Sequence, residues 1–354
     1  MRQQGEIVNG MSWYFASFNR NKRSVVLDLR SDAGMAALRR LIRTAQVIVD
    51  NFRPGVMAQM GLTWESLQAL SPGMVHASIN GFGEAGPYVD RPAFDFIAQA
   101  MSGYMTLNGT PESGPLRTAL PLSDLVAGNY AALGTMAALL RRERTGQGER
   151  VSVSLVDGLM SYGAFSSANF LASGRLPERT GNDHPLVSPY GLFTAGDGDL
   201  AVAPSNDAFY YRLLAALGLD RLRDDARFAT SALRVQNRAA INALVSAAMV
   251  HRPKAHWIDA LNAAGVPCGT VQNLAEAYAD PQVRSQEMLL EVEHPGHGAV
   301  KMNGFPVKFT QDPCHVRYPA PDLGAHTEAV LREAGCSAPE IASLLAPAPR
   351  TGSA

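Results

Sequence analysis

Strand-like and helix-like segments alternate through the first half of the chain, and this alternation constrains the fold more than any other feature. Residues 24–29 are rich in β-branched side chains and predict a strand, and residues 47–50 predict another. The segment between them has apolar residues at helical spacing, with Ser31 or Asp32 placed to cap a helix. A strand, a helix and a second strand in this order predict a parallel sheet with helices on its faces.

The same alternation continues beyond this first unit. A helix capped by Thr63 leads into a predicted strand over residues 74–79. Apolar periodicity then predicts helices over residues 94–107, 125–144 and 158–172. We therefore expect an α/β fold in which a parallel sheet carries long helices on its faces.

The chain has 354 residues, more than one hydrophobic core usually supports. Composition becomes loop-rich near residue 173, and strand-like runs return at residues 289–292 and 300–309. The change of composition predicts that a second domain begins near residue 174.

Charge and cysteine content exclude several classes of protein. Thirty-one basic and thirty-two acidic side chains leave a formal charge of -1, so we expect no nucleic-acid partner and no membrane partner. Cys268, Cys314 and Cys336 are scattered, and no histidine pair has metal-ligand spacing, so we expect neither a disulfide framework nor a bound metal. No segment has the apolar length of a signal peptide or a membrane span, and we predict a cytoplasmic protein.

A glycine-rich loop follows the strand predicted over residues 74–79. Residues 81–86 have the G-x-G-x-x-G spacing that can hold a dinucleotide pyrophosphate. Pro87 and Pro92 deny the loop the long helix that such a site needs. Two other interpretations of residues 81–86 remain: a mobile glycine loop beside an active site, and a plain surface turn.

Asp124 stands at the beginning of the longest apolar helix. Its carboxylate should lie near unpaired backbone N–H groups and the positive end of the helix dipole, which favour the ionised form. An ionised carboxylate in a sheltered cleft can attack a thioester carbonyl. The alternative is that Asp124 only caps its helix.

Several motifs occur in an order that makes the chain resemble the family III CoA transferases. The resemblance spans nearly the whole chain. It rests on residues 18–24 (FNRNKRS), 50–55 (DNFRPG), 81–88 (GFGEAGPY), 121–134, 144–148, 265–269, 293–295 and 323–327.

The resemblance implies a reaction for Asp124. In that family, the nucleophile is an aspartate ahead of a Y-A-A-x-G pattern, and Asp124 precedes such a pattern at residues 130–134. Asp124 would accept the acyl group of a donor acyl-CoA as a mixed anhydride, would then carry CoA as a thioester, and would pass CoA to a carboxylic acid.

Further site residues follow from the same resemblance. The backbone of Gly81, Phe82 and Gly83 would stabilise oxyanions, and Asp95 would take part in proton transfer. Coenzyme A would be a substrate, with no covalently bound cofactor. Its expected contacts are Leu27, Arg30, Asn51, Phe52, Arg53 and Met60.

The family also implies a domain organisation: a large Rossmann-like domain over residues 1–173 that ends in a linker helix, a smaller α+β domain over residues 174–280, and a return segment over residues 281–354 that completes the large domain. Two such rings would interlock as a homodimer. Members usually have a longer N-terminal part, with a further strand and helix, so we expect an N-terminally short form of the fold. The loss of these elements leaves open a catalytically impaired homologue that only binds CoA.

The second alternative to a CoA transferase is a racemase. The related α-methylacyl-CoA racemases pair the aspartate with a histidine, and that position holds Phe94 here, which cannot exchange a proton. Residues 181–185 replace the multi-glycine lid of formyl-CoA transferases. This difference favours succinate or another dicarboxylate as one partner.

Overall fold

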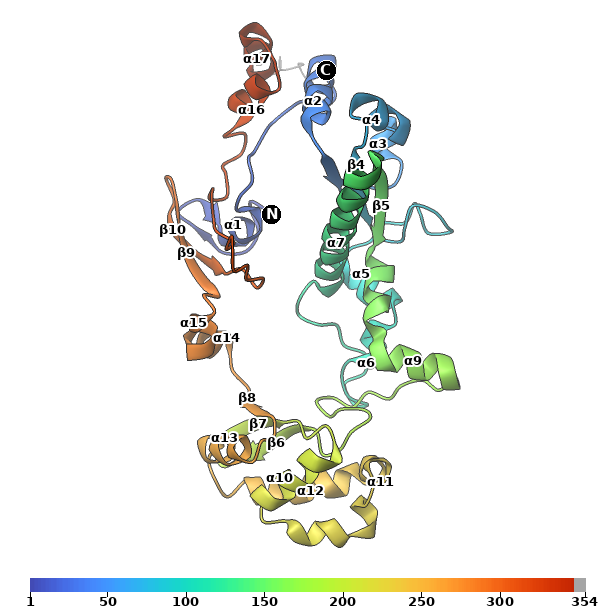
Figure 1. The fold of residues 1–354 in the computed structure, drawn as a ribbon, viewed down its shortest axis with the longest axis vertical. Helices are drawn as coiled ribbons and strands as arrows, with labels where there is room; N and C mark the ends of the chain where they lie inside the picture. The colour runs from blue at the N-terminus through green and yellow to red at the C-terminus, as the bar shows by residue number, and fades with distance from the viewer. Residues whose placement is uncertain (347–354) are drawn as a thin grey trace, which may run out of the picture.

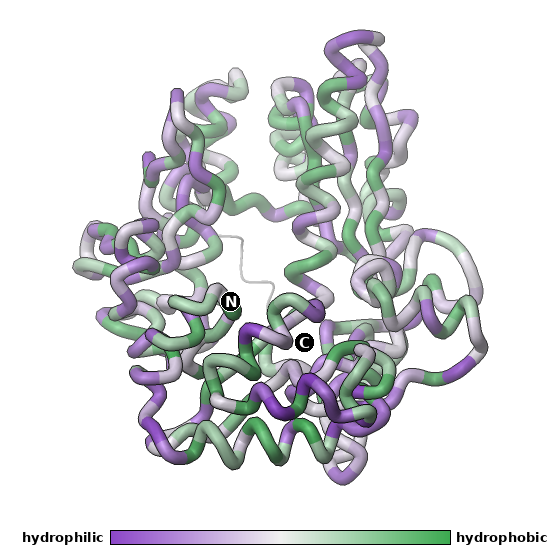
Figure 2. Tube along the Cα trace, turned by 60° about the horizontal axis from the view of Figure 1, so that its bottom comes forward, coloured by the Kyte–Doolittle hydropathy of each residue, from purple (hydrophilic) through white to green (hydrophobic). Residues whose placement is uncertain are grey.

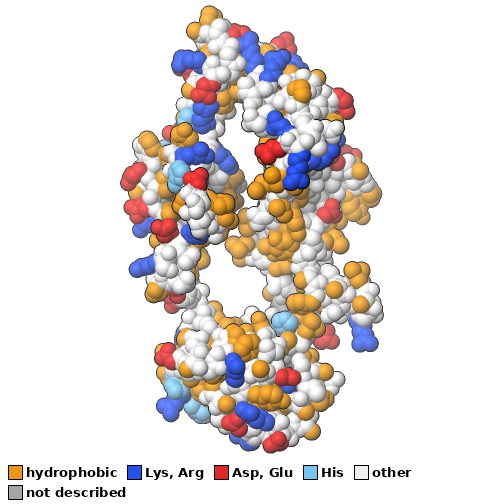
Figure 3. Space-filling view, in the orientation of Figure 1, with side chains coloured by type: hydrophobic (Ala, Val, Ile, Leu, Met, Phe, Trp, Pro, Cys, Tyr) orange, Lys and Arg blue, Asp and Glu red, His pale blue; other side chains and the backbone are white. Residues whose placement is uncertain are grey.

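The structure, a computed structural model, describes residues 1–346 and traces an elongated ring (Figure 1). A sheet with its helices forms one long side, the two ends of the chain form the other, and a separate α+β unit joins them at one end. The space-filling view shows an opening through the ring (Figure 3). The last part of the predicted return segment, residues 347–354, lies outside the described residues.

The predicted parallel sheet is confirmed. Its strands are β3 (Val47–Asp50), β4 (Val75–Asn80) and β5 (Glu149–Ser154), in the order β3-β4-β5, with Val47 opposite Val75 and Val75 opposite Glu149. The helices of this part include α2 (Asp32–Thr44), α3 (Val56–Gln59), α4 (Trp64–Leu70) and α7 (Leu122–Thr145).

Local capping chemistry sets where these helices begin. The hydroxyl of Ser31 accepts a hydrogen bond from the Gly34 N–H, and Thr63 accepts one from the Ser66 N–H. Between α7 and β5, a Cβ added at Gly134 would lie 2.7 Å from Val151 Cγ1. Glycine is therefore needed for the helix to lie this close to the strand.

The strand predicted over residues 24–29 is wrong. Residues 24–28 have no regular secondary structure and Leu29 lies in a turn; the segment bonds to the residues around the start of α16 (Thr327–Glu333). The Ser24 carbonyl accepts from His326 N–H, and the Val26 N–H donates to Thr327 Oγ1. β-branched residues favour an extended backbone, but a strand also needs a neighbour to pair with.

Two predicted long helices are each divided in the structure. The first consists of α5 (Asp95–Met101) and α6 (Tyr104–Leu107), separated where Gly103 adopts a left-handed φ of 82°. The second consists of α8 (Leu155–Met160), η1 (Ser161–Gly163) and α9 (Ala164–Ser173), and Ala164 has a φ of 42°. Apolar periodicity continues across both breaks, so it could not reveal them.

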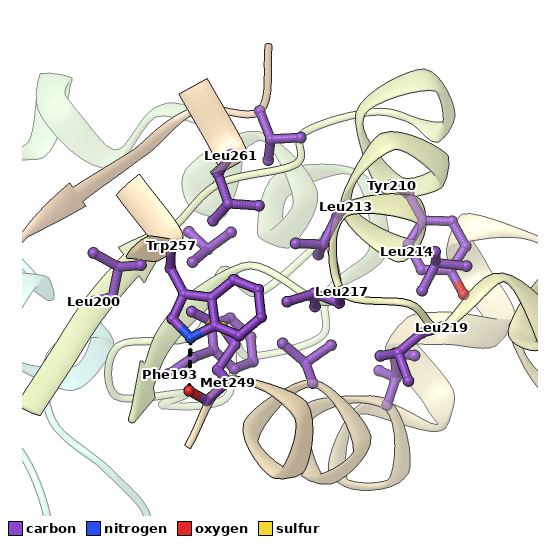
Figure 4. Close-up of a cluster of buried hydrophobic side chains, with 14 of the residues drawn as sticks. Phe193, Leu200, Tyr210, Leu213, Leu214, Leu217, Leu219, Met249, Trp257 and Leu261 are labelled. Carbon is purple, nitrogen blue, oxygen red and sulfur yellow. Dashed lines mark hydrogen bonds between the residues drawn. The ribbon is translucent and has the colours of Figure 1, made fainter. Parts of the chain in front are cut away.

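The α+β unit has its own hydrophobic core, drawn in Figure 4. Trp257 lies in this core, and its Nε1 donates to the Met249 carbonyl at 2.7 Å. The antiparallel sheet has the order β6-β7-β8. The elements are β6 (Gly191–Ala195), β7 (Gly198–Val202), α10 (Asp207–Ala216), η2 (Asp220–Asp224), η3 (Ala226–Phe228), α11 (Ser231–Gln236), α12 (Arg238–Met249), α13 (Lys254–Ala263) and β8 (Cys268–Thr270).

The two ends of the chain pack together and close the ring. Phe15 from the N-terminal part shares a core cluster with Val300 and Met302, and Ala37 shares another with Leu331. The predicted strand over residues 300–309 already ends at Asn303. The elements here are β1 (Ile7–Val8), β2 (Met11–Ser12), α1 (Trp13–Asn19), α14 (Leu274–Ala279), α15 (Pro281–Ser285), β9 (Leu289–His294), β10 (Gly298–Asn303), α16 (Thr327–Glu333) and α17 (Ala338–Leu345).

Apolar residues are spread over many helices around the ring (Figure 2). Within residues 1–346, no helix has both the length and the apolar character needed to cross a bilayer. The domain boundaries at residues 173 and 280 stay predictions.

Candidate active site

The topology brings three predicted site segments to one edge of the parallel sheet. β3 and β4 end at Asp50 and Asn80, so residues 51–53 and 81–83 both follow carboxyl ends of strands. Helix α7 runs directly into β5, which is parallel to β4, so the first turn of α7 returns to this same edge. Ligands of open α/β sheets bind outside the carboxyl ends of the strands.

Asp124 does not cap its helix. The N-cap is Pro121 and α7 begins at Leu122, so Asp124 lies within the first turn. Its side chain is exposed to solvent. The alternative in which Asp124 only caps α7 is therefore wrong, and its carboxylate is accessible to a ligand.

The cap of α7 comes from another helix. Asp95, at the start of α5, is 8% exposed, and its Oδ1 accepts hydrogen bonds from the N–H and the hydroxyl of Ser123, both at 2.9 Å. Its Oδ2 accepts from Gln99 Nε2 at 2.8 Å. Proline at the N-cap offers no side-chain acceptor, and Asp95 supplies one across space.

These contacts give Asp95 a structural task, because both of its oxygens are bound. Its expected part in proton transfer stays a prediction. Sequence reasoning missed Ser123 and Gln99, since neither residue carries a recognisable motif.

The electrostatics of Asp124 differ from the sequence expectation. Asp124 keeps contact with solvent, but neighbouring protein atoms partly desolvate its carboxylate, and this desolvation raises the pKa of Asp124 above its ordinary value. The negative charge of Asp95 raises this pKa further. The field of a helix N-terminus acts in the opposite direction on a carboxylate. A carboxylate with a raised pKa is more basic, which makes it a better nucleophile.

The glycine loop is held tightly against the start of α5. A Cβ added at Gly81 would lie 2.5 Å from the Cβ of Ala93, and Gly83 has a φ of 97°. No helix follows the loop until Asp95, so the dinucleotide alternative lacks its pyrophosphate-binding helix. Gly83 N–H donates to Asn80 Oδ1, so it can serve an oxyanion only if that contact breaks.

Asn80 is a site residue that sequence reasoning missed. It is 7% exposed, and its Nδ2 is buried without a hydrogen-bond partner among the described residues. Buried amide groups are usually paired, so an orphaned donor at the ligand edge of a sheet is a notable feature. A polar residue that ends a strand directly before the glycine loop was the signal that could have found it.

The expected CoA contacts fall into two groups. Asn51, Phe52 and Arg53 are exposed in the turn after β3, and Arg30 is exposed just before α2. Leu27 and Met60 are instead partly buried, each against a hydrophobic cluster: Leu27 packs on that of Ala37 and Leu331, and Met60 on that of Ile42 and Leu67.

A hollow of about 540 Å³ lies elsewhere, on the segment after β10. Phe305, Cys314 and His315 are among its lining residues. None of its lining residues follows a strand of the parallel sheet. Across residues 1–346, no group of three or more His, Cys, Asp or Glu side chains is arranged to hold a metal ion.

Residues 1–327 match the family described as CoA-transferase family III. The succinate–glutarate CoA-transferase of Agrobacterium fabrum is 36% identical over 320 residues, which cover 90% of this chain and 80% of that protein. The acetyl-CoA:oxalate CoA-transferase of Acetobacter aceti is 37% identical over 334 residues, covering 94% and 85%. A CaiB/BaiF family protein from Brucella suis has a similar crystal structure, with a TM-score of 0.81, 34% identity, and coverage of 94% of this chain and 88% of that one. These matches confirm the resemblance carried by the motifs.

Proposed function

Because this chain belongs to CoA-transferase family III and is an enzyme of that kind, we propose that Asp124 is the group that accepts and passes on the acyl and CoA groups. One observation carries the proposal. Asp124 presents an exposed carboxylate with a raised pKa at the ligand edge of the parallel sheet, and it is not used to cap its own helix.

The first half-reaction transfers the acyl group and then CoA to the enzyme. A carboxylate oxygen of Asp124 attacks the thioester carbonyl of the donor, the C–S bond breaks, and CoA leaves as a thiolate. The thiolate then attacks the Asp124 carbonyl carbon of the mixed anhydride. The donor acid leaves as a carboxylate, and an aspartyl-CoA thioester remains.

The second half-reaction reverses these steps with the acceptor. The acceptor carboxylate attacks the aspartyl thioester and expels the CoA thiolate, which forms a second mixed anhydride. The thiolate then attacks the acyl carbon of the acceptor and releases Asp124 as a carboxylate. No proton is consumed, and every bond that breaks is replaced by one that forms.

Each attack creates an oxyanion that needs hydrogen-bond donors in place beforehand. We assign this role to the backbone of Gly81 and Phe82 and to the Asn80 side chain, and to the Gly83 N–H once it leaves Asn80 Oδ1. The unpaired Asn80 Nδ2 supports the assignment, because a ligand oxygen at this edge would satisfy it. CoA itself would contact Asn51, Phe52 and Arg53, with Arg30, Leu27 and Met60 as the remaining proposed contacts.

The acceptor or donor acid is proposed to be a dicarboxylate such as succinate. The support comes from relatives whose names specify succinate with glutarate, or oxalate. Phe94 is 81% exposed beside Asp95, and its phenyl ring cannot act as the second acid/base of a racemase.

We further propose that two chains interlock as a homodimer in the cytoplasm. Leu133, Met136 and Leu140 lie along one face of α7 and are 63%, 62% and 58% exposed. Apolar side chains also gather where α5 and α7 border the opening of the ring (Figure 3). A contiguous apolar face of this kind needs a covering partner, and a second copy threaded through the ring would supply it.

The test of the chemistry is an Asp124→Asn variant, with Asp259→Asn on the exposed face of α13 as the matched control. Incubation with succinyl-CoA should give the wild type and the control a hydroxylamine-sensitive adduct at Asp124, found by mass spectrometry, and Asp124→Asn should give neither adduct nor CoA transfer. Full transfer by Asp124→Asn would refute the assignment. CoA binding without any adduct in the wild type would identify a homologue that binds CoA but does not turn over.

A further inference from the structure

A buried histidine and aspartate pair lies inside the parallel sheet, outside the groups used in the proposed reaction. His76 Nε2 lies 2.6 Å from Asp50 Oδ2, and the two side chains are only 7% and 8% exposed. His76 is on β4 and Asp50 is the last residue of β3, the neighbouring strand. The register sets His76 opposite Ile48, so its ring reaches diagonally forward to Asp50 at the carboxyl edge.

Stability alone is a poor explanation for this pair. Removing an ionisable pair from water carries a desolvation penalty, and apolar side chains of similar size would often hold a sheet equally well. β3 and β4 are already joined by their backbone ladder. The pair is better understood through the other contact of Asp50.

The second oxygen of Asp50 shapes the turn that follows the strand. Oδ1 accepts the Phe52 N–H at 3.0 Å, which sets the direction of the backbone as it leaves β3. The turn ends at Gly55, whose φ of 88° places it in the left-handed region. Asn51, Phe52 and Arg53 lie between these two points with exposed side chains.

His76 fixes the carboxylate that makes this turn. An aspartate bound only to the Phe52 N–H could rotate toward solvent, since its second oxygen would have no partner in the sheet. The ring nitrogen of His76 holds Oδ2, which leaves Oδ1 aimed at the Phe52 N–H. The chain of contacts therefore runs from β4 through Asp50 to the backbone of residue 52.

We propose that His76 is a positioning residue for coenzyme A, acting through Asp50 to fix the turn of residues 51–53 before the ligand binds. The inference rests on the proposed function, in which this turn contacts CoA. A preformed turn spares the ligand the cost of ordering it, so the effect belongs to binding. The reacting carboxylate, Asp124, is on a different element, and its chemistry should be largely unaffected.

The test compares His76→Phe with His76→Gln. Phenylalanine fills the same space without a donor, whereas glutamine keeps a side-chain N–H that can reach Asp50. Ser78→Ala is the matched control, because Ser78 is buried on the same strand and lies opposite Asp50 in the ladder. Three quantities are measured for each variant. Calorimetry gives the affinity for free CoA, steady-state kinetics with succinyl-CoA give kcat and KM, and hydrogen exchange gives the opening of the amides of residues 51–55 in the unliganded protein.

We expect His76→Phe to weaken CoA binding and raise KM about tenfold, the effect of one hydrogen bond to a charged group, with kcat changed less than about threefold. Exchange of the Phe52 amide should accelerate. His76→Gln should recover most of the affinity, and Ser78→Ala should resemble the wild type.

Three outcomes would overturn the inference. In the first, His76→Phe binds CoA as tightly as the wild type with unchanged exchange at residues 51–55, and the proposed function survives. In the second, affinity and melting temperature fall together and glutamine rescues neither, which leaves His76 a purely structural residue. If the wild type itself binds no CoA, the proposed function falls along with the inference. If His76→Phe does not fold, His76→Gln still tests the inference, because the inference requires His76→Gln to bind CoA nearly as tightly as the wild type. Weak CoA binding by a folded His76→Gln would contradict it.

Discussion

Replacing Gly81 with alanine should separate the placement of the glycine loop from the chemistry of Asp124. The new Cβ would lie 2.5 Å from the Cβ of Ala93. Non-bonded carbons need about 3.5–4.0 Å, so the loop and the start of α5 must separate by about 1 Å or more. Overpacking of this kind costs about 1–3 kcal/mol of folding free energy.

The effect on catalysis should be larger than the effect on folding. Ala93 precedes Asp95 by two residues in the sequence, and Asp95 caps the helix that carries Asp124. A displacement of about 1 Å between reacting groups can lower the rate about a hundredfold. We therefore expect Gly81→Ala to reduce kcat with succinyl-CoA about a hundredfold, while the protein remains folded.

A compensating change makes the test specific. Ala93→Gly removes the atom that clashes, so the double variant Gly81→Ala/Ala93→Gly should recover most of the lost kcat. Gly269→Ala is the matched control, because a Cβ there meets nothing within 4 Å and its activity should be unchanged. Full kcat in Gly81→Ala, or no recovery in the double variant, would refute the reasoning.

Three further predictions concern the site and the core. Asp95→Asn removes a charge that raises the pKa of Asp124, so this pKa should fall in the variant. Activity is lost as pH falls through the pKa of Asp124, so the acid limb of the kcat/KM profile should move to lower pH, and an acid limb at the wild-type pH would contradict the prediction. Asn80→Ala should lower kcat about a hundredfold with little change in KM, as expected for the loss of one oxyanion donor, and a purely KM effect would assign Asn80 to binding instead. Trp257→Phe removes the indole hydrogen bond to the Met249 carbonyl, which keeps only the longer bond from the Arg252 N–H at 3.3 Å, and should lower the free energy of unfolding by about 0.5–1.5 kcal/mol; an unchanged urea midpoint would show that the indole bond adds nothing.

Local features of the fold could be predicted because they depend on neighbours in the sequence. Ser31 and Thr63 cap their helices as expected, and the strand predicted over residues 47–50 is β3 with the same bounds. The strand predicted over residues 24–29 failed because pairing depends on a distant partner. The long helix predicted over residues 94–107 failed where Gly103 adopts a left-handed backbone within an otherwise periodic segment.

The candidate site shows the same division. Asp124 could be found from its place before an apolar helix and from a family pattern. The cap that Asp95 gives to Ser123 and the contact between His76 and Asp50 join residues that are 28 and 26 positions apart. No spacing rule connects such pairs, and only the folded sheet and helices bring them together.

The sequence by itself determined the family, the alternation of strands and helices, and the identity of the carboxylate at the start of the longest helix. Tertiary structure alone decided the electrostatic state of that carboxylate. Helix position argued for a lowered pKa, but burial and the charge of Asp95 raise it. The physical reason is that desolvation and Coulomb interactions depend on distances through space, which the order of residues along the chain does not contain.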